Sequence, residues 1–309
     1  SLIEIKKVHK KYDKIEALKG ISFKINSGEL FGILGPNGAG KTTLINIINT
    51  LLPFDAGKVL INGLNLKQHT AKIKRIIGVV PQEISLYEDL TALENLRFWG
   101  TIYNIKKKDL KERCDEILRM VGLYSRRKDA IKHFSGGMKR RINIAAGLLH
   151  NPQIILMDEP TVGVDPQSRN FIFELIMQLK ELGRTIIYTT HYMEEAEKLC
   201  DRIAIIDKGK LIALDTKKEL YKMLGNKNKL IIKFKDEINI PELKKILKDY
   251  NITSSDNYTI QITEKNIIDK MENILNILRS LELELEELDY LKPTIEDLFL
   301  QLTGRELRE

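Results

Sequence analysis

One glycine-rich segment limits the fold of this chain more than any other feature. It lies between an apolar run at residues 30–34 and a helical pattern that begins at residue 41. Its residues are Gly35, Pro36, Asn37, Gly38, Ala39, Gly40, Lys41 and Thr42, with Thr43 next in the helix. Glycines allow a tight turn whose backbone N–H groups converge, and the helix adds its positive N-terminal end. The sequence therefore predicts a strand, a phosphate-binding loop and a helix in succession.

Short runs rich in Ile and Val recur between longer helical patterns. They lie at residues 30–34, 76–80, 154–157, 185–190 and 203–206. Buried strands separated by helices are typical of a mainly parallel sheet in an α/β domain. Residues 3–8 and 21–25 instead alternate apolar and polar side chains, as half-exposed antiparallel strands do. We therefore predict an α/β core, of the P-loop NTPase type, with an antiparallel β subdomain.

The middle and the end of the chain follow other patterns. Between residues 83 and 149 we find no strand-like run, and apolar residues such as Leu93, Leu96 and Ile117 recur at helical spacing, which predicts a helical subdomain over about 83–150. A polar, turn-prone stretch at 223–228 is followed by strands at 229–235, 258–263 and 282–291 and helices at 241–250, 266–281 and 294–303. We therefore expect a nucleotide-binding domain at 1–225 and a small α+β domain at 226–309.

Composition excludes several classes of protein. Apolar residues make up 43% of the 309 residues and charged residues 30%, which is typical of a globular protein and not of a disordered one. No run approaches the ~18 clean apolar residues that a bilayer span needs. The first residues lack the apolar run of a signal peptide, and the two cysteines, Cys114 and Cys200, suit a reducing compartment. We therefore expect a cytoplasmic chain with no zinc site.

Charge is divided unevenly along the chain. Residues 226–309 hold 13 Lys and Arg against 17 Asp and Glu, a net charge of −4, which leaves +11 for residues 1–225. A positive surface suits nucleic acid, the anionic face of a membrane or a polyphosphate ligand. Charge alone does not choose among these partners.

A second motif ends a buried strand with two carboxylates, Asp158 and Glu159. Ligands bind at the carboxyl ends of strands in open α/β sheets. Together with the loop, this predicts that Lys41 neutralises the β- and γ-phosphate oxygens, while Thr42 and Asp158 hold Mg²⁺. Glu159 is placed to polarise a water molecule.

A third motif narrows the class. Ser135, Gly136, Gly137 and Met138 follow Phe134 and precede three basic residues. Here the sequence resembles the ATP-binding cassette (ABC) ATPases, whose signature is Leu-Ser-Gly-Gly-Gln, and the resemblance extends over residues 1–222. It implies that Tyr12 stacks on adenine and that Gln82, in the Q-loop, senses Mg²⁺ and water. It also implies that Asp165 belongs to the D-loop (163–165) and that His191 contacts the γ-phosphate.

The signature also has a physical interpretation of its own. A Ser before two glycines at a helix start is an N-cap, which leaves N–H groups and a positive helix end for an anion. In this family two anion sites per chain imply a head-to-tail dimer, homomeric or heteromeric, in which ATP lies between Lys41 of one chain and Ser135 of the other. The signature departs from the family pattern in having Met138 for Gln and Phe134 for Leu. In these departures, and in residues 190–197 and 293–305, the sequence resembles exporter ATPases for drugs, antibiotics or sodium.

We therefore expect the ATP-hydrolysing subunit of a transporter, and the resemblance implies an exporter, with this chain on the inner face of the cell membrane. Residues 87–103 are where separate membrane-spanning subunits are expected to dock. One alternative is a soluble ABC ATPase that acts on nucleic acid or the ribosome. The single cassette without a long inserted coiled coil counts against nucleic acid as a partner. A non-hydrolysing scaffold is opposed by the intact Lys41, Asp158, Glu159 and His191.

Overall fold

The computed structural model describes residues 1–225, 227–254 and 256–304. These fall into two compact units, the first formed by Ser1–Thr216 and the second beginning at Lys217. The predicted boundary at 225/226 separates two domains that are expected to fold independently, and it stays a prediction. Residue 226 itself lies outside the described residues.

A six-stranded sheet forms the centre of the first unit, in the order β10-β9-β3-β8-β7-β6. Every neighbouring pair is parallel except β10 and β9, which are antiparallel. The strands are β3 (Leu30–Leu34), β6 (Ile77–Val80), β7 (Ile154–Asp158), β8 (Thr185–Thr190), β9 (Arg202–Asp207) and β10 (Lys210–Thr216). The predicted mainly parallel sheet is confirmed, and β3, β7 and β8 end at the same edge.

An antiparallel sheet lies beside it, in the order β2-β1-β4-β5. Its strands are β1 (Ile3–Tyr12), β2 (Ile15–Ile25), β4 (Ala56–Ile61) and β5 (Leu64–Asn65). Apolar residues of both sheets and of helix α1 (Lys41–Ile48) form one core, which includes Ile5, Ile33 and Leu44. Helix α1 is therefore held between the two sheets, and its first residue lies at the end of β3.

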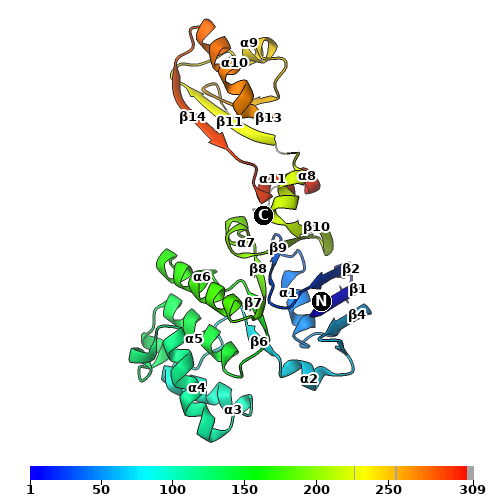
Figure 1. Cartoon of the computed structure of the whole chain (residues 1–309), viewed down its shortest axis with the longest axis vertical. Coiled ribbons are helices and arrows are strands. Elements are labelled where there is room, and N and C mark those ends of the chain that lie inside the picture. Colours follow the sequence, from blue (N-terminus) through cyan, green and yellow to red (C-terminus); the bar gives the residue numbers. More distant parts are fainter. Residues whose placement is uncertain (226, 255, 305–309) are drawn as a thin grey trace. The chain divides into compact units, whose positions relative to one another are not determined.

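Helices make up the middle of the chain, as predicted. Short α2 (Thr70–Lys74) precedes β6, and then α3 (Ala92–Ile102), α4 (Lys107–Met120) and α5 (Gly136–Leu148) form a lobe at one end of the unit (Figure 1). Two 3-10 turns, Tyr124–Arg126 and Ile131–His133, connect α4 to α5. Helices α6 (Pro166–Glu181) and α7 (Met193–Leu199) follow β7 and β8. The helical lobe carries Ser135 at the start of α5.

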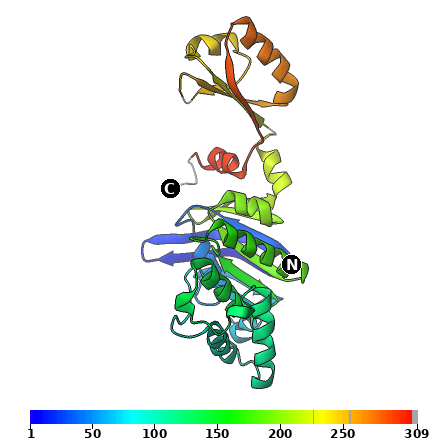
Figure 2. The same cartoon turned by 90° about the vertical axis from the view of Figure 1, so that its left-hand side faces the viewer.

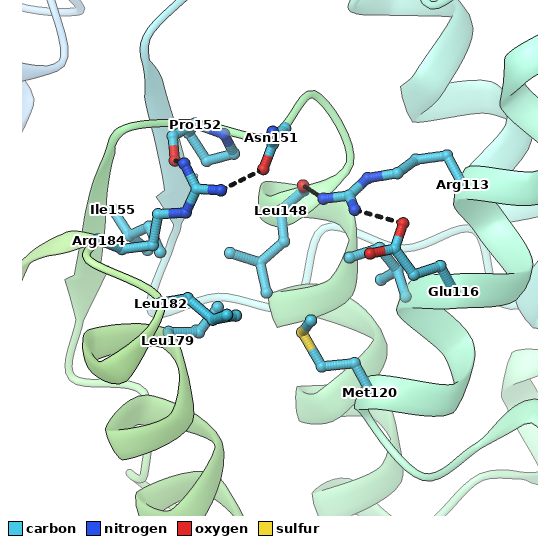
Figure 3. Close-up of a pocket in the computed structure, with 11 residues that line it drawn as sticks. Arg113, Glu116, Met120, Leu148, Asn151, Pro152, Ile155, Leu179, Leu182 and Arg184 are labelled. Carbon is cyan, nitrogen blue, oxygen red and sulfur yellow. Dashed lines mark hydrogen bonds and ion pairs between the residues drawn. The ribbon is translucent and has the colours of Figure 1, made fainter.

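A cavity of about 370 Å³ lies where the helical lobe meets α6 and β7 (Figure 3). On its lobe side, Arg113 of α4 donates to the carbonyl oxygens of Leu148 (2.8 Å) and Leu149 (2.9 Å) at the end of α5. On its core side, Arg184 donates to the carbonyl oxygen of Pro152 (3.2 Å) and to Oδ1 of Asn151 (2.6 Å). Each wall of the cavity is thus fixed by one arginine.

The second unit contains a four-stranded antiparallel sheet in the order β12-β13-β11-β14. Its elements are α8 (Lys217–Met223), β11 (Lys227–Phe234), α9 (Ile240–Ile246), β12 (Ile252–Ser254), β13 (Thr259–Lys265), α10 (Ile267–Ser280), β14 (Leu285–Leu291) and α11 (Ile295–Thr303). Alternate residues of β11 and β13, such as Ile232 and Ile262, form a core with α9 and α10, which cover one face of the sheet (Figure 2). Helices α8 and α11 pack on each other. This is the expected α+β arrangement.

Among the described residues, no helix is both long enough and apolar enough to cross a bilayer.

Candidate functional site

The loop between β3 and α1 is built where only glycine fits. A Cβ atom on Gly35 would lie 2.2 Å from the carbonyl oxygen of Ile206, and one on Gly40 would lie 2.7 Å from that of Ala17. Gly40 also has a φ of 107°, which side chains rarely adopt. Gly38 has a φ of 77° with nothing within 4 Å of a Cβ atom, so its surroundings are open. The loop is therefore packed at its base and accessible at its tip.

The start of α1 has the features of an anion site. No side chain of the described residues caps the helix, and its first turn holds no acidic residue. Lys41, with only 4% of its surface exposed, donates from Nζ to the carbonyl oxygens of Gly35 (2.8 Å) and Pro36 (3.1 Å). The loop thus surrounds a buried ammonium group, while Thr42 is exposed beside it. Backbone N–H groups at a helix start and a cation are the donors that phosphates take.

The ends of β7 and β8 bring the predicted acidic and histidine residues to this loop. Glu159 lies 3.1 Å from Lys41 Nζ through Oε1 and 3.1 Å from His191 Nδ1 through Oε2. Its φ of 46° turns the chain sharply after the strand. Lys41, Glu159 and His191 therefore form one continuous chain of ammonium, carboxylate and imidazole.

Thr189 of β8 contacts the side chain of Asp158 and the backbone of Glu159, and the sequence did not indicate it. Its Oγ1 donates to Oδ1 of Asp158 at 2.5 Å and accepts from the backbone N–H of Glu159 at 3.0 Å. Asp158 and Glu159 are each 5% exposed. A threonine inside an apolar strand run was the available signal, because a buried hydroxyl needs partners.

The signature does not contact Lys41 of the same chain among the described residues. It packs beside the D-loop and the start of α6. Ser135 caps α5, with Oγ accepting from the N–H of Met138 at 3.2 Å. Asp165 caps α6, with Oδ1 accepting from the N–H of Ser168 at 2.9 Å, and this bond holds the pKa of Asp165 below its usual value. A Cβ atom on Gly137 would lie 2.0 Å from Ser168 Oγ, whereas one on Gly136 would meet only the Gly163 carbonyl oxygen, at 4.0 Å. Gly137 is thus a packing residue, and Gly136 faces open space.

Two side chains of α5 hold the Q-loop (residues 81–85), and these the sequence did not reveal either. Arg140 donates to the carbonyl oxygens of Pro81 (2.9 Å) and Gln82 (2.6 Å). Oδ1 of Asn143 accepts from the N–H of Ser85 at 3.1 Å. Burial lowers the pKa of Arg140. The backbone of Gln82 is thus held by Arg140, whereas its side-chain amide is exposed and accessible.

Tyr12 ends β1 with 43% of its surface exposed. Lys10 Nζ lies 5.4 Å from the centre of its ring. The ring is thus accessible to a planar group, and its stacking on adenine stays a prediction.

Comparison with known proteins agrees with this geometry. The family model described as ABC transporter matches residues 18–162. Over its whole length the chain is 45% identical to the linearmycin resistance ATP-binding protein LnrL of Bacillus subtilis (strain 168), with 100% of both chains covered. It is 32% identical to the Nod factor export ATP-binding protein I of Rhizobium sp. (strain N33), with 99% and 98% covered.

Solved structures are similar to about two thirds of this chain. One is a dimeric post-hydrolysis state of the ATP-binding cassette MJ0796 bound to ADP and Pi, which is 32% identical with a TM-score of 0.64. That match covers 69% of this chain and 98% of the other. The predicted fold and the resemblance to exporter ATPases are confirmed. This chain belongs to the ABC transporter family and is one of its ATP-hydrolysing, ATP-binding subunits.

Proposed function

We propose that this chain hydrolyses Mg²⁺-bound ATP to drive an exporter, on whose membrane-spanning subunits it docks at the inner face of the cell membrane. The observation that carries the proposal is the series of contacts from buried Lys41 through buried Glu159 to half-buried His191 at the phosphate loop. It joins a phosphate-binding cation, a base and a histidine in one place.

The donor set fits a nucleotide with its metal. The N–H groups at the start of α1 and the Lys41 ammonium would hold the phosphates, and Tyr12 would stack on the base. Thr42, Asp158 and Gln82 offer the oxygen ligands that Mg²⁺ prefers, and the bound ion would neutralise phosphate charge. Thr43, Ala39 and Asn37 belong to the same loop and helix start.

Hydrolysis needs a water aligned with the γ-phosphate and a base to accept its proton. Glu159 would be this base, a role worth about 10²- to 10⁴-fold in rate. His191 contacts Oε2 of Glu159 and would keep the water and the phosphate aligned. Lys41 contacts the other oxygen, so Glu159 lies between the group that binds phosphate and the group that orients the water.

The signature would complete the site of a second ATPase chain. Its open face at Gly136 and its capped helix start would meet the γ-phosphate held by the partner's loop, with Asp165 beside it. Two solved structures of the cassette MJ0796 are dimeric, which supports a dimer of ATPase chains. The partner would be a second copy of this chain or a related ATPase chain.

Membrane subunits would dock beside the Q-loop. A cavity of about 520 Å³ is lined there by residues that include Pro81, Trp99, Tyr103 and Asn143. Exposed apolar side chains lie on the same segment, among them Ile84 and Tyr87. An apolar hollow next to the tethered Q-loop suits an amphipathic segment of a membrane subunit. The names of the relatives, which speak of linearmycin resistance, daunorubicin resistance and Nod factor export, support a role in export, and they do not favour a role on nucleic acid or the ribosome.

A mixing experiment tests the shared site. Lys41→Ala removes the phosphate-binding cation, and Gly136→Asp puts a carboxylate on the open face of the signature, where it would repel phosphate. Each variant alone should be inactive. Equal amounts make half of the dimers mixed, each with one intact site of two, so hydrolysis should recover to about a quarter of wild type if the sites act independently.

Two outcomes would contradict the proposal. Full activity of either variant alone would mean that the altered group is not needed. Hydrolysis per wild-type chain that stays constant on dilution far below the range of dimerisation would mean that each chain has a complete site.

A further inference from the structure

One buried carboxylate near the site has no role in the mechanism so far. Glu195, on α7, is 3% exposed. Its two oxygens accept hydrogen bonds from three hydroxyl groups: Thr161 Oγ1 at 2.8 and 3.0 Å, Tyr188 OH at 2.8 Å and Thr190 Oγ1 at 2.9 Å. Nε of Arg169 lies 3.8 Å from Oε1. A buried carboxylate with this many partners is costly to disturb.

The Tyr188 hydroxyl remains a hydrogen-bond donor because of its surroundings. Burial, and then the charge of Glu195, raises the pKa of the Tyr188 hydroxyl, which therefore keeps its proton at any physiological pH. The three hydroxyls and the guanidinium together compensate the carboxylate for the water it has lost.

These partners come from the two segments that carry Glu159 and His191: Thr161 and Arg169 follow Glu159, and Tyr188 and Thr190 precede His191 at the end of β8. Thr161 follows Glu159 by two residues, and its carbonyl oxygen accepts from the N–H of Val164 in the D-loop (3.2 Å). Thr190 precedes His191, and its Oγ1 also accepts from the N–H of Tyr192 (2.9 Å). Arg169 lies one turn into α6, the helix that Asp165 caps. One side chain thus joins the D-loop, the start of α6 and the His191 turn.

We propose that Glu195 is a positioning residue that holds the D-loop and His191 in register with Glu159 for hydrolysis. The inference rests on the proposed role of His191. If ATP and the partner chain move the D-loop, the Glu195 network passes that movement to the His191 turn, because both are bonded to the same carboxylate.

The test compares two buried carboxylates. Glu195→Gln keeps the side-chain shape but removes the charge and replaces one acceptor oxygen with a donor. The matched control is Glu29→Gln, since Glu29 is also buried (7% exposed), accepts from the N–H of Asn26 (2.6 Å) and pairs with Arg202 (3.2 Å), but precedes β3 at the other end of the strand from the loop. For each full-length variant the kcat for ATP, the Kd for ATP and the thermal unfolding of the first unit are measured.

We expect kcat to fall about 10- to 100-fold in Glu195→Gln, the size of a misalignment effect, while Kd stays within about twofold. Glu29→Gln should keep kcat within about twofold of wild type. In a His191→Ala background, Glu195→Gln should cause no further loss, because it acts through His191. A merely structural role would lower the unfolding temperature and add to the His191→Ala loss.

The outcomes separate the inference from the proposed function. Wild-type hydrolysis by His191→Ala would refute the proposed role of His191. Loss of hydrolysis in His191→Ala together with equal kcat for Glu195→Gln and Glu29→Gln would overturn the inference alone. If Glu195→Gln fails to fold, Thr161→Val and Thr190→Val each remove one hydrogen bond to the carboxylate, and an unchanged kcat in both would overturn it equally.

Discussion

The two glycines of the signature should respond in opposite ways to the same substitution. A methyl group on Gly137 would lie 2.0 Å from Ser168 Oγ and 2.4 Å from Ser168 Cβ, whereas on Gly136 it would have 4.0 Å to the nearest atom. Because Ser168 Cβ is fixed to the backbone of α6, Gly137→Ala must push α5 and α6 apart. Overpacking of this kind costs about 1–3 kcal/mol.

The magnitude follows from comparing the two variants. Replacing Gly by Ala in a helix gains up to about 1 kcal/mol, and this gain is common to both positions, so it cancels in the difference. Gly136→Ala should therefore be more stable than Gly137→Ala by about 1–3 kcal/mol. A difference of 2 kcal/mol would separate their unfolding temperatures by about 4–8 °C in a unit of this size.

Fluorescence of Trp99 provides the assay, because it is the one tryptophan in the sequence and lies on α3 in the first unit. Gly136→Ala should nevertheless lose most ATP hydrolysis, since its methyl group stands on the face proposed to meet the partner's nucleotide. Ser168→Gly should restore stability to Gly137→Ala in a double-mutant cycle. Equal unfolding temperatures for the two alanine variants, or no coupling between positions 137 and 168, would refute this assignment of the two glycines.

Three further predictions concern the base, the boundary and a buried histidine. Glu159→Gln should bind ATP normally but hydrolyse it at least ~10²-fold more slowly, and with Mg-ATP it should elute as a dimer in size-exclusion chromatography; a wild-type rate would contradict its role as base. Limited proteolysis should cut near residues 225–228, and a chain that ends at 225 should still bind ATP, whereas loss of all binding would make the tail part of the nucleotide domain. Burial lowers the pKa of His150, so its contribution to stability is present above its unfolded pKa of about 6.5 and is lost as pH falls toward its folded pKa. Urea unfolding at pH 7.5, 6.5 and 5.5 should therefore show a smaller loss of unfolding free energy on acidification for His150→Phe than for wild type. The exposed control His133→Asn should lose as much as wild type.

Local patterns predicted the parts of the site that lie at strand ends. The apolar runs that became β3, β7 and β8 are buried along their whole length, so each stood out from its flanks, and each delivers a functional residue directly after its last position. The predictions that failed to mark β4 and β10 have a physical reason. The apolar runs of these strands are short (residues 59–61 and 211–214), and only two positions of β4 and one of β10 are buried, so neither strand has the fully buried pattern of β3, β7 and β8.

The connections between motifs could not be predicted in the same way. Glu195 and Thr161 are 34 residues apart, and Arg140 and Gln82 are 58 apart. Nothing in the local sequence says which distant hydroxyl or carbonyl such a side chain will meet. Sequence therefore predicts which groups do the chemistry, whereas the structure is needed to identify the groups that hold them in place.

We expect the two arginines at the cavity of Figure 3 to determine where the helical lobe can rotate. Arg113 fastens α4 to the last turn of α5, and Arg184 fastens the connector at Asn151 to the core. A short stretch of backbone joins the end of α5 to the core, and in it Asn151 has a φ of 56°. We expect the lobe to rotate as a rigid body about this stretch, and the cavity leaves room for the rotation. Arg140 bonds the Q-loop to α5, so the Q-loop would move with the lobe. Gln82 would then approach or leave the phosphate site in step with the signature, so that a site with its partner signature in place is also a site with its glutamine in place.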